Sequence, residues 1–203
     1  MNEISKKMLL EHRHKIAMGN VMDLYEGRAK EGLVLDTFAA STMVARRTLW
    51  KYRTKGAFPS FRFLRAAAEF FRIHIVELLC SQDELREMLS DASIRRDDIQ
   101  IGTTEVHYDI EYEQVLRTNL RRERCRRGMY PSELVRLAGN HISLMSHYRY
   151  EDKCDTYPLW HIFPVASVLG VSPLDLLTPN ERRREIYGWL AEKYLPNGNS
   201  PSV

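Results

Sequence analysis

The chain has 203 residues, of which 44% are hydrophobic and 28% charged, and its formal net charge is +3. This balance is that of a folded protein rather than a disordered one, and the length allows two small domains. Three cysteines, Cys80, Cys125 and Cys154, are too few and too widely spaced for a disulfide framework or a CxxC metal site. We therefore expect no cofactor, no metal and a reducing, cytoplasmic compartment. The apolar run from Met8 to Leu10 is too short for a signal peptide, and no stretch is long enough to cross a membrane.

The first 89 residues have the spacing of a helical domain. Apolar residues recur at helical intervals over residues 3–18, and a second apolar stripe runs from Val21 to Gly32. The Gly19-Asn20 pair between them predicts a break, and so two helices. Short helical segments separated by turn residues then follow as far as Leu79.

Residues 90–111 have the composition of an acidic linker. Within it, Val106, Tyr108 and Ile110 alternate with polar residues after Gly102. Alternation of this kind favours β structure, so the linker has room for a short β-hairpin.

Helical spacing resumes in residues 112–195, which we assign to a second domain, and residues 196–203 form a flexible tail. Near the end of this domain Ile186, Trp189 and Leu190 form an apolar stripe. That stripe must be buried either on the second domain or against another subunit.

The two halves of the chain repeat each other. Each contains a helical segment, a glycine, two further helical segments and a similar ending, Ile73–Leu79 in the first half and Val171–Leu177 in the second. Two copies of a unit this size indicate duplicated domains rather than a solenoid, which needs at least three. The sequence therefore predicts an all-α protein.

The clearest functional pattern lies between Asp36 and Phe58. A first helix ends in a turn after Met43, and a second helix runs from Ala45 to about Thr54 with Leu49 and Tyr52 facing inward. Gly56 suits the end of that helix. The remaining faces of the second helix carry Arg46, Arg47, Trp50, Lys51, Arg53 and Lys55. A short helix with an exposed basic face is what the major groove of DNA accepts.

Residues 37–60, continuing through Phe70 and Phe71 to Leu79, resemble the Cro/phage-repressor (XRE-type) helix-turn-helix family. The resemblance implies a lambda-repressor-like domain of five helices, of which the third reads bases. It implies base contacts by Arg46, Arg47 and Lys51. It implies contacts to the DNA backbone by Thr48, Lys55, Ser60 and Arg62. Arginine can bind the O6 and N7 atoms of guanine together, so we expect half-sites that contain guanine.

The second copy resembles the same family from Gly128 to Leu177, with a recognition helix expected over Ile142–Tyr150. In this alignment Met145 and Tyr148 face inward, and the connection after the helix is two or three residues longer and acidic. The positions that match Arg46, Arg47 and Lys51 are then Ile142, Ser143 and His147. The second-domain candidates for DNA contact are Ser143, His147, Arg121 and Arg122. Base reading is expected mainly from the first copy.

These features predict a sequence-specific transcriptional regulator, repressor-like in its action, that binds double-stranded DNA at the nucleoid. We expect a homodimer paired through residues 1–30, the linker or the helix that carries Trp189, in preference to a pseudo-dimer in which one chain fills both half-sites. No catalytic motif points to an enzyme.

The alternative is a protein-interaction module derived from a helix-turn-helix, such as an antitoxin or an antagonist of another regulator, with a regulatory protein as its partner. Other residues also have plainer interpretations. The basic helix could be a solvated surface, and Trp50 could pack on a neighbouring helix. The arginines of residues 121–127 could be paired with Glu123. His141 and His147 near Cys154 match no standard zinc spacing, so we expect them to be structural or solvated.

Overall fold

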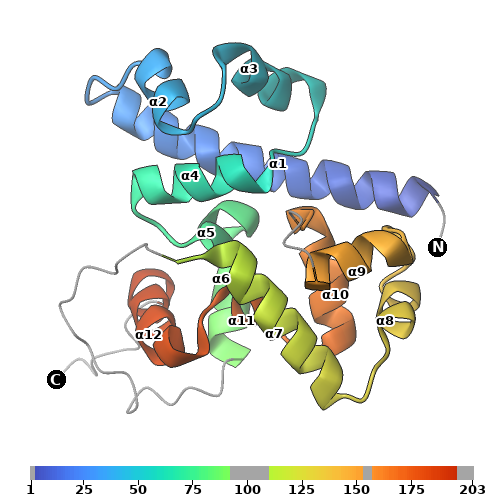
Figure 1. Ribbon diagram of the computed structural model, residues 1–203. Coiled ribbons are helices and arrows are strands. Elements are labelled where there is room, and N and C mark those ends of the chain that lie inside the picture. Colours follow the sequence, from blue (N-terminus) through green and yellow to red (C-terminus); the bar gives the residue numbers. More distant parts are fainter. Residues whose placement is uncertain (1–2, 92–109, 153–156, 196–203) are drawn as a thin grey trace, which may run out of the picture.

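The computed structural model describes residues 3–91, 110–152 and 157–195, and these residues form helices and turns without a strand. The all-α expectation is therefore confirmed for this part of the chain (Figure 1). The expected hairpin falls almost entirely in residues 92–109 and the expected tail in residues 196–203, which lie outside the described residues.

The first unit, as we call the helices up to residue 91, has six helices. They are α1 (Glu3–Ala29), α2 (Leu35–Ser41), α3 (Arg46–Lys55), α4 (Phe61–Phe71), α5 (Ile75–Leu79) and α6 (Gln82–Asp91). The second unit follows from residue 110. Its helices are α7 (Tyr112–Arg126), α8 (Pro131–Leu137), α9 (Leu144–Asp152), η2 (Leu159–His161), α10 (Ile162–Leu169), α11 (Pro173–Leu177), η3 (Asn180–Arg182) and α12 (Arg183–Tyr194). None of the described helices is both long and apolar enough to span a membrane.

The expected break at Gly19-Asn20 is wrong, because α1 is one continuous helix of 27 residues. Gly19 is exposed and meets no atom that would need special space, so it costs the helix only the usual ~0.5–1 kcal/mol of a glycine. Asn20 faces the other way, and its amide donates hydrogen bonds to the carbonyl oxygens of Glu77, Leu78 and Cys80 at 3.0, 3.3 and 2.9 Å. Tertiary hydrogen bonds thus hold Asn20 within the helix.

The second unit contains an equivalent set of hydrogen bonds. The amide of Asn119 on α7 donates to the carbonyl oxygens of Asp175, Leu176 and Thr178 at 3.1, 3.1 and 2.9 Å. The helices held in this way, α5 and α11, both begin with a capping box, built on His74 in the first unit and on Ser172 in the second. The two similar endings seen in the sequence therefore form equivalent helices.

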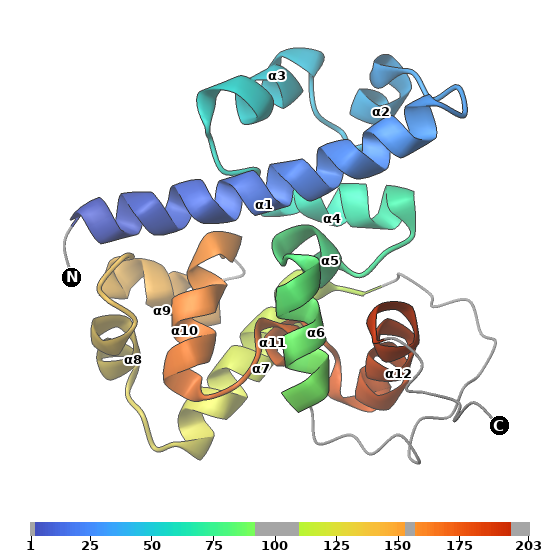
Figure 2. The same ribbon diagram turned by 180° about the vertical axis from the view of Figure 1, so that it is seen from behind.

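The two units share one hydrophobic core. Helix α5 packs against α11, and α6 packs against α12 (Figure 2). Ile186 and Leu190 of α12 are fully buried, so the apolar stripe of that helix is covered within the chain. Across the units, the guanidinium of Arg13 on α1 lies 3.4 Å from the ring centroid of Phe163 on α10.

Both views place α2 and α3 on one side of α1 and the second unit on the other (Figures 1 and 2). The α2–α3 pair therefore stands at one end of the molecule.

Candidate nucleic-acid interface

The turn between α2 and α3 is four residues long, from Thr42 to Ala45. The buried hydroxyl of Thr42 donates to the carbonyl oxygen of Phe38 at 2.9 Å and closes the end of α2. Met43 adopts a left-handed conformation with φ 54°, which turns the chain into the new helix. The start of α3 at Arg46 lies within one residue of the start expected from the sequence.

The inner side of α3 is fixed to the core. Leu49 is buried, and the ring of Tyr52 lies 5.2 Å from the ring of Phe63 on α4. The Nε2 atom of His14 on α1 lies 2.7 Å from the carbonyl oxygen of Tyr52 and forms a hydrogen bond with it. Gly56 ends the helix in the left-handed conformation, with φ 64°. These contacts hold α3 in one orientation.

The outer side of α3 is strongly basic. The helix carries five cationic side chains and no acidic one, and all five are exposed: Arg46, Arg47, Lys51, Arg53 and Lys55. The nearest acid is Asp36, whose carboxylate lies 3.5 Å from the Arg46 guanidinium. Both side chains of this pair are exposed to water, so the attraction between them is weak.

Trp50 lies among these cations. Its side chain is 54% exposed, and the Lys55 ammonium lies 5.7 Å from its ring centroid. Trp50 is therefore not buried against a neighbouring helix.

The residues expected to touch the DNA backbone lie around α3. Thr48 is half-buried in its first turn, and Lys55 is exposed in its last turn. Ser60 is the N-cap of α4 and accepts a hydrogen bond from the backbone N–H of Phe63 at 3.2 Å. Arg62 is exposed, with its guanidinium 3.2 Å from the sulfur of Met43.

Comparison with known proteins gives no relative for this arrangement. No family model matches the chain, and neither a curated protein nor a solved structure matches it. A function for the α2–α3 surface therefore rests on its own residues.

The equivalent turn in the second unit is six residues long, from Ala138 to Ser143. Gly139 and Asn140, both with positive φ, lie inside it. Ser143 precedes α9, and its hydroxyl accepts a hydrogen bond from the N–H of Ser146 at 3.0 Å, as an N-cap does. The expected start at Ile142 is therefore wrong by two residues.

Because this turn is longer, each residue of α9 corresponds to a different residue of α3 than the sequence alignment predicts. Leu144 becomes the equivalent of Arg46, and His147 the equivalent of Leu49. Met145 and Tyr148, expected to face inward, are 65% and 41% exposed, so that expectation is wrong. The extra residues come before α9 and not after it. The number of residues from His147 to Gly170, at the end of α10, is the same as the number from Leu49 to Arg72, at the end of α4. No residue is therefore inserted between these equivalent positions.

His147 is fully buried and cannot contact DNA from the position shown. Its Nε2 atom lies 2.9 Å from the carboxylate of Glu151, which also accepts two hydrogen bonds from Arg124 at 2.9 and 2.7 Å. Burial alone would raise the pKa of the Glu151 carboxyl, but the hydrogen bonds from His147 and Arg124 lower it to about 2. This polar network takes the place of the apolar Leu49.

The arginine run that ends α7 is mostly paired inside the chain. Glu123 receives Arg122 at 3.2 Å and Arg127 at 2.9 Å, while Arg124 is held by Glu151. Arg121 is exposed on the same helix. The pairing with Glu123 is therefore present, and it leaves Arg121 as the more accessible of the two α7 candidates.

Among the residues that the structure describes, no three acidic, histidine or cysteine side chains are grouped so that they could hold a metal ion. His141 and His147 are both buried, in agreement with a structural role. Cys154 lies outside the described residues.

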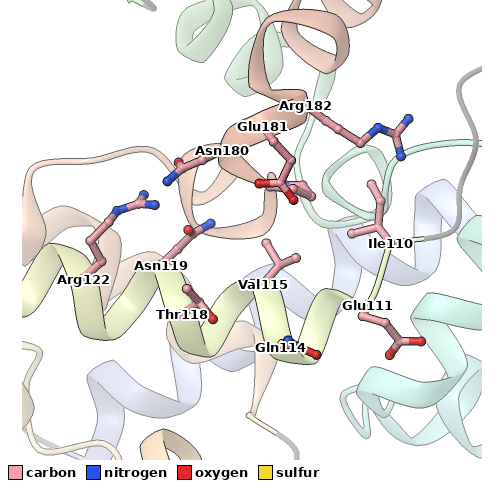
Figure 3. Close-up of a pocket in the computed structure, with 11 residues that line it drawn as sticks. Ile110, Glu111, Gln114, Val115, Thr118, Asn119, Arg122, Asn180, Glu181 and Arg182 are labelled. Carbon is pink, nitrogen blue, oxygen red and sulfur yellow. The ribbon is translucent and has the colours of Figure 1, made fainter.

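A cleft of about 390 Å³ lies between α7 and η3 (Figure 3). Three of its polar side chains are already used by the fold. The Asn119 amide holds three carbonyl groups, the Arg122 guanidinium pairs with Glu123, and the Arg182 guanidinium pairs with Glu185 at 3.0 Å. These three side chains are therefore held by the fold and not by a ligand.

Proposed function

We propose that the chain is a sequence-specific regulator of transcription, repressor-like in its action, that binds double-stranded DNA through α3. In this proposal each unit is a lambda-repressor-like helix-turn-helix domain, and the first unit reads the bases. The observation that carries the proposal is the two-sided character of α3. Leu49 and Tyr52 fix one side to the core, and the other side presents five cations without an acid.

The positions of the cations suit base reading in the major groove. Arg46 and Arg47 begin the helix, and Lys51 follows one turn later. The helix N-terminus itself carries a partial positive charge that favours phosphate. An arginine paired with guanine contributes about 1–3 kcal/mol of discrimination against other bases. In this proposal the exposed Lys55, in the last turn of α3, and the exposed Arg62, in the first turn of α4, contact the DNA backbone.

A merely solvated helix is the main competing interpretation. Helix α12 of the same chain carries charges of both signs, with Arg183, Arg184 and Lys193 beside Glu185 and Glu192. Helix α3 lacks this mixture of signs. A one-signed surface repels itself unless a partner of opposite charge covers it, which favours a polyanion such as DNA.

The test is selection from a pool of random duplex DNA, followed by sequencing of the retained molecules. We expect the wild-type chain to enrich a defined motif that contains guanine, and the Arg46→Ala/Arg47→Ala variant to lose it. The matched control is Arg126→Ala/Arg184→Ala, which removes the same charge from exposed positions of the second unit and should keep the motif. Weak, salt-sensitive retention that is equal for all three proteins would mean generic attraction to phosphate and would exclude base reading.

A protein-interaction module is the second candidate, and the outward face of α9 favours it. The positions that carry Arg46 and Arg47 in the first unit carry Leu144 and Met145 in the second. A chain that uses only such a face would show no sequence preference in the selection described above.

A further inference from the structure

The second unit exposes a group of large apolar side chains, which we call the apolar face. Their exposed fractions run from 37% to 75%. The members are Tyr130, Leu137, Leu144, Met145 and Tyr148. Tyr130 and Leu137 mark the two ends of α8, and the other three lie on consecutive turns of α9, which packs against α8.

These side chains occupy the positions that form the α2–α3 surface in the first unit. Tyr130 is the N-cap of α8 as Val34 is of α2, and Leu137 ends α8 as Ser41 ends α2. Leu144, Met145 and Tyr148 are the first, second and fifth residues of α9, where α3 has Arg46, Arg47 and Trp50. The members therefore share one outward surface.

The apolar face is poorly suited to DNA. The head of α9 offers no cation where α3 offers two arginines, and the inner position is filled by the buried His147. Tyrosine and methionine are enriched at protein interfaces, and contiguous exposed apolar surface commonly marks a protein contact. The occupant should therefore be a protein.

The charges around the apolar face indicate which protein. Four charged side chains lie within one helical turn of a member of the face: Glu133, Arg136, Arg149 and Asp152. Two are cations and two are anions. Such a rim does not select a strongly charged partner. Across a two-fold axis, however, a cation of one copy can face an acid of the other.

The other surfaces through which the units associate are already used. Helices α5 and α6 pack against α11 and α12 within the chain, and these include the helix of Trp189. We propose that the apolar face joins two copies of this chain about a two-fold axis. This pairing does not depend on DNA, and it leaves α3 of each copy free on the far side of α1.

Sedimentation of the full-length chain over a concentration series tests the proposal. We expect the wild type to form a dimer, and Met145→Glu to raise the dissociation constant by at least about tenfold, because the variant places a carboxylate in an apolar contact. The control is Met43→Glu, which changes a methionine of nearly equal exposure, 68% against 65%, on the α2–α3 side of the molecule. That variant should dimerise like the wild type.

Because both methionines are exposed, both variants should unfold at the wild-type temperature, which circular dichroism checks. A wild type that remains monomeric over the whole series would overturn the proposal. So would a dimer that Met145→Glu and Tyr148→Glu both leave unchanged, or one that Met43→Glu disrupts to the same degree.

Discussion

Individual buried histidines set the response of the fold to acid. His74 at the start of α5 is 1% exposed, and His161 at the end of η2 is fully buried. Burial lowers the pKa of both side chains from 6.5 to about 3, and His141 and His147 add to the effect at His161. Both imidazoles are therefore neutral in the folded chain at neutral pH.

The sign of the pH dependence follows from proton binding. Between pH 6.5 and about 3 the unfolded chain binds protons at these two histidines and the folded chain does not. The free energy of unfolding should therefore be at its full value above pH 6.5 and fall as the pH drops, by about 1.4 kcal/mol per pH unit for each histidine. Glu151 acts in the same direction, because its lowered pKa stabilises the fold only while the carboxyl is ionised.

Urea unfolding at a series of pH values checks this prediction. The informative variant is His74→Asn, since asparagine can also cap α5 but does not titrate. Its unfolding free energy should depend less steeply on pH than that of the wild type, by about one proton. An unchanged slope would mean that His74 is not held in its neutral form by the fold.

At the scale of elements, the continuity of α1 leads to a second prediction. Gly19→Ala should raise the free energy of unfolding by about 0.5–1 kcal/mol, because the site is helical and an added Cβ meets no atom within 4 Å. Gly56→Ala is the matched comparison and should lower it, because its φ of 64° strains any side chain. Thermal unfolding of both variants gives the answer. If Gly19→Ala destabilises the chain, α1 is broken at this residue.

The two recognition-helix candidates show what the sequence can and cannot predict. The bounds of α3 follow from its own residues, since Leu49 and Tyr52 have helical spacing and Gly56 ends the pattern. The sequence pattern predicts the start of α9 two residues too early, because the apolar Met145 and Tyr148 have the same spacing as Leu49 and Tyr52. In the structure Met145 and Tyr148 face solvent.

The inward residue of α9 is instead His147, a buried polar side chain that forms a hydrogen bond with Glu151. Its burial depends on Glu151 and on Arg124, which is 27 residues away from that glutamate and invisible to any local pattern. One local signal was present. The Gly139-Asn140 pair, with positive φ at both residues, accommodates two extra residues in the turn.

At the scale of the whole molecule, the chain is two similar units with different outward faces. The hydrogen bonds of Asn20 and Asn119 hold equivalent helices together in both units. On this shared arrangement α3 of the first unit presents cations, and the apolar face of the second unit presents apolar side chains. The repeat could be predicted from the similar endings. The close association of the units could not, because it depends on contacts such as Arg13 with Phe163 that link distant parts of the chain.

The central claim of the proposed function follows from this asymmetry: we propose that base reading comes mainly from α3. The most direct test is to measure the base-preference profile of two single variants against the wild type on the selected DNA. Arg47→Ala should flatten the preference at one base position by about 1–3 kcal/mol and leave the others in place. Arg62→Ala should weaken binding to all sequences alike and leave the profile unchanged. If both variants instead weaken binding uniformly, without changing any position of the profile, Arg47 does not read a base and the claim is contradicted.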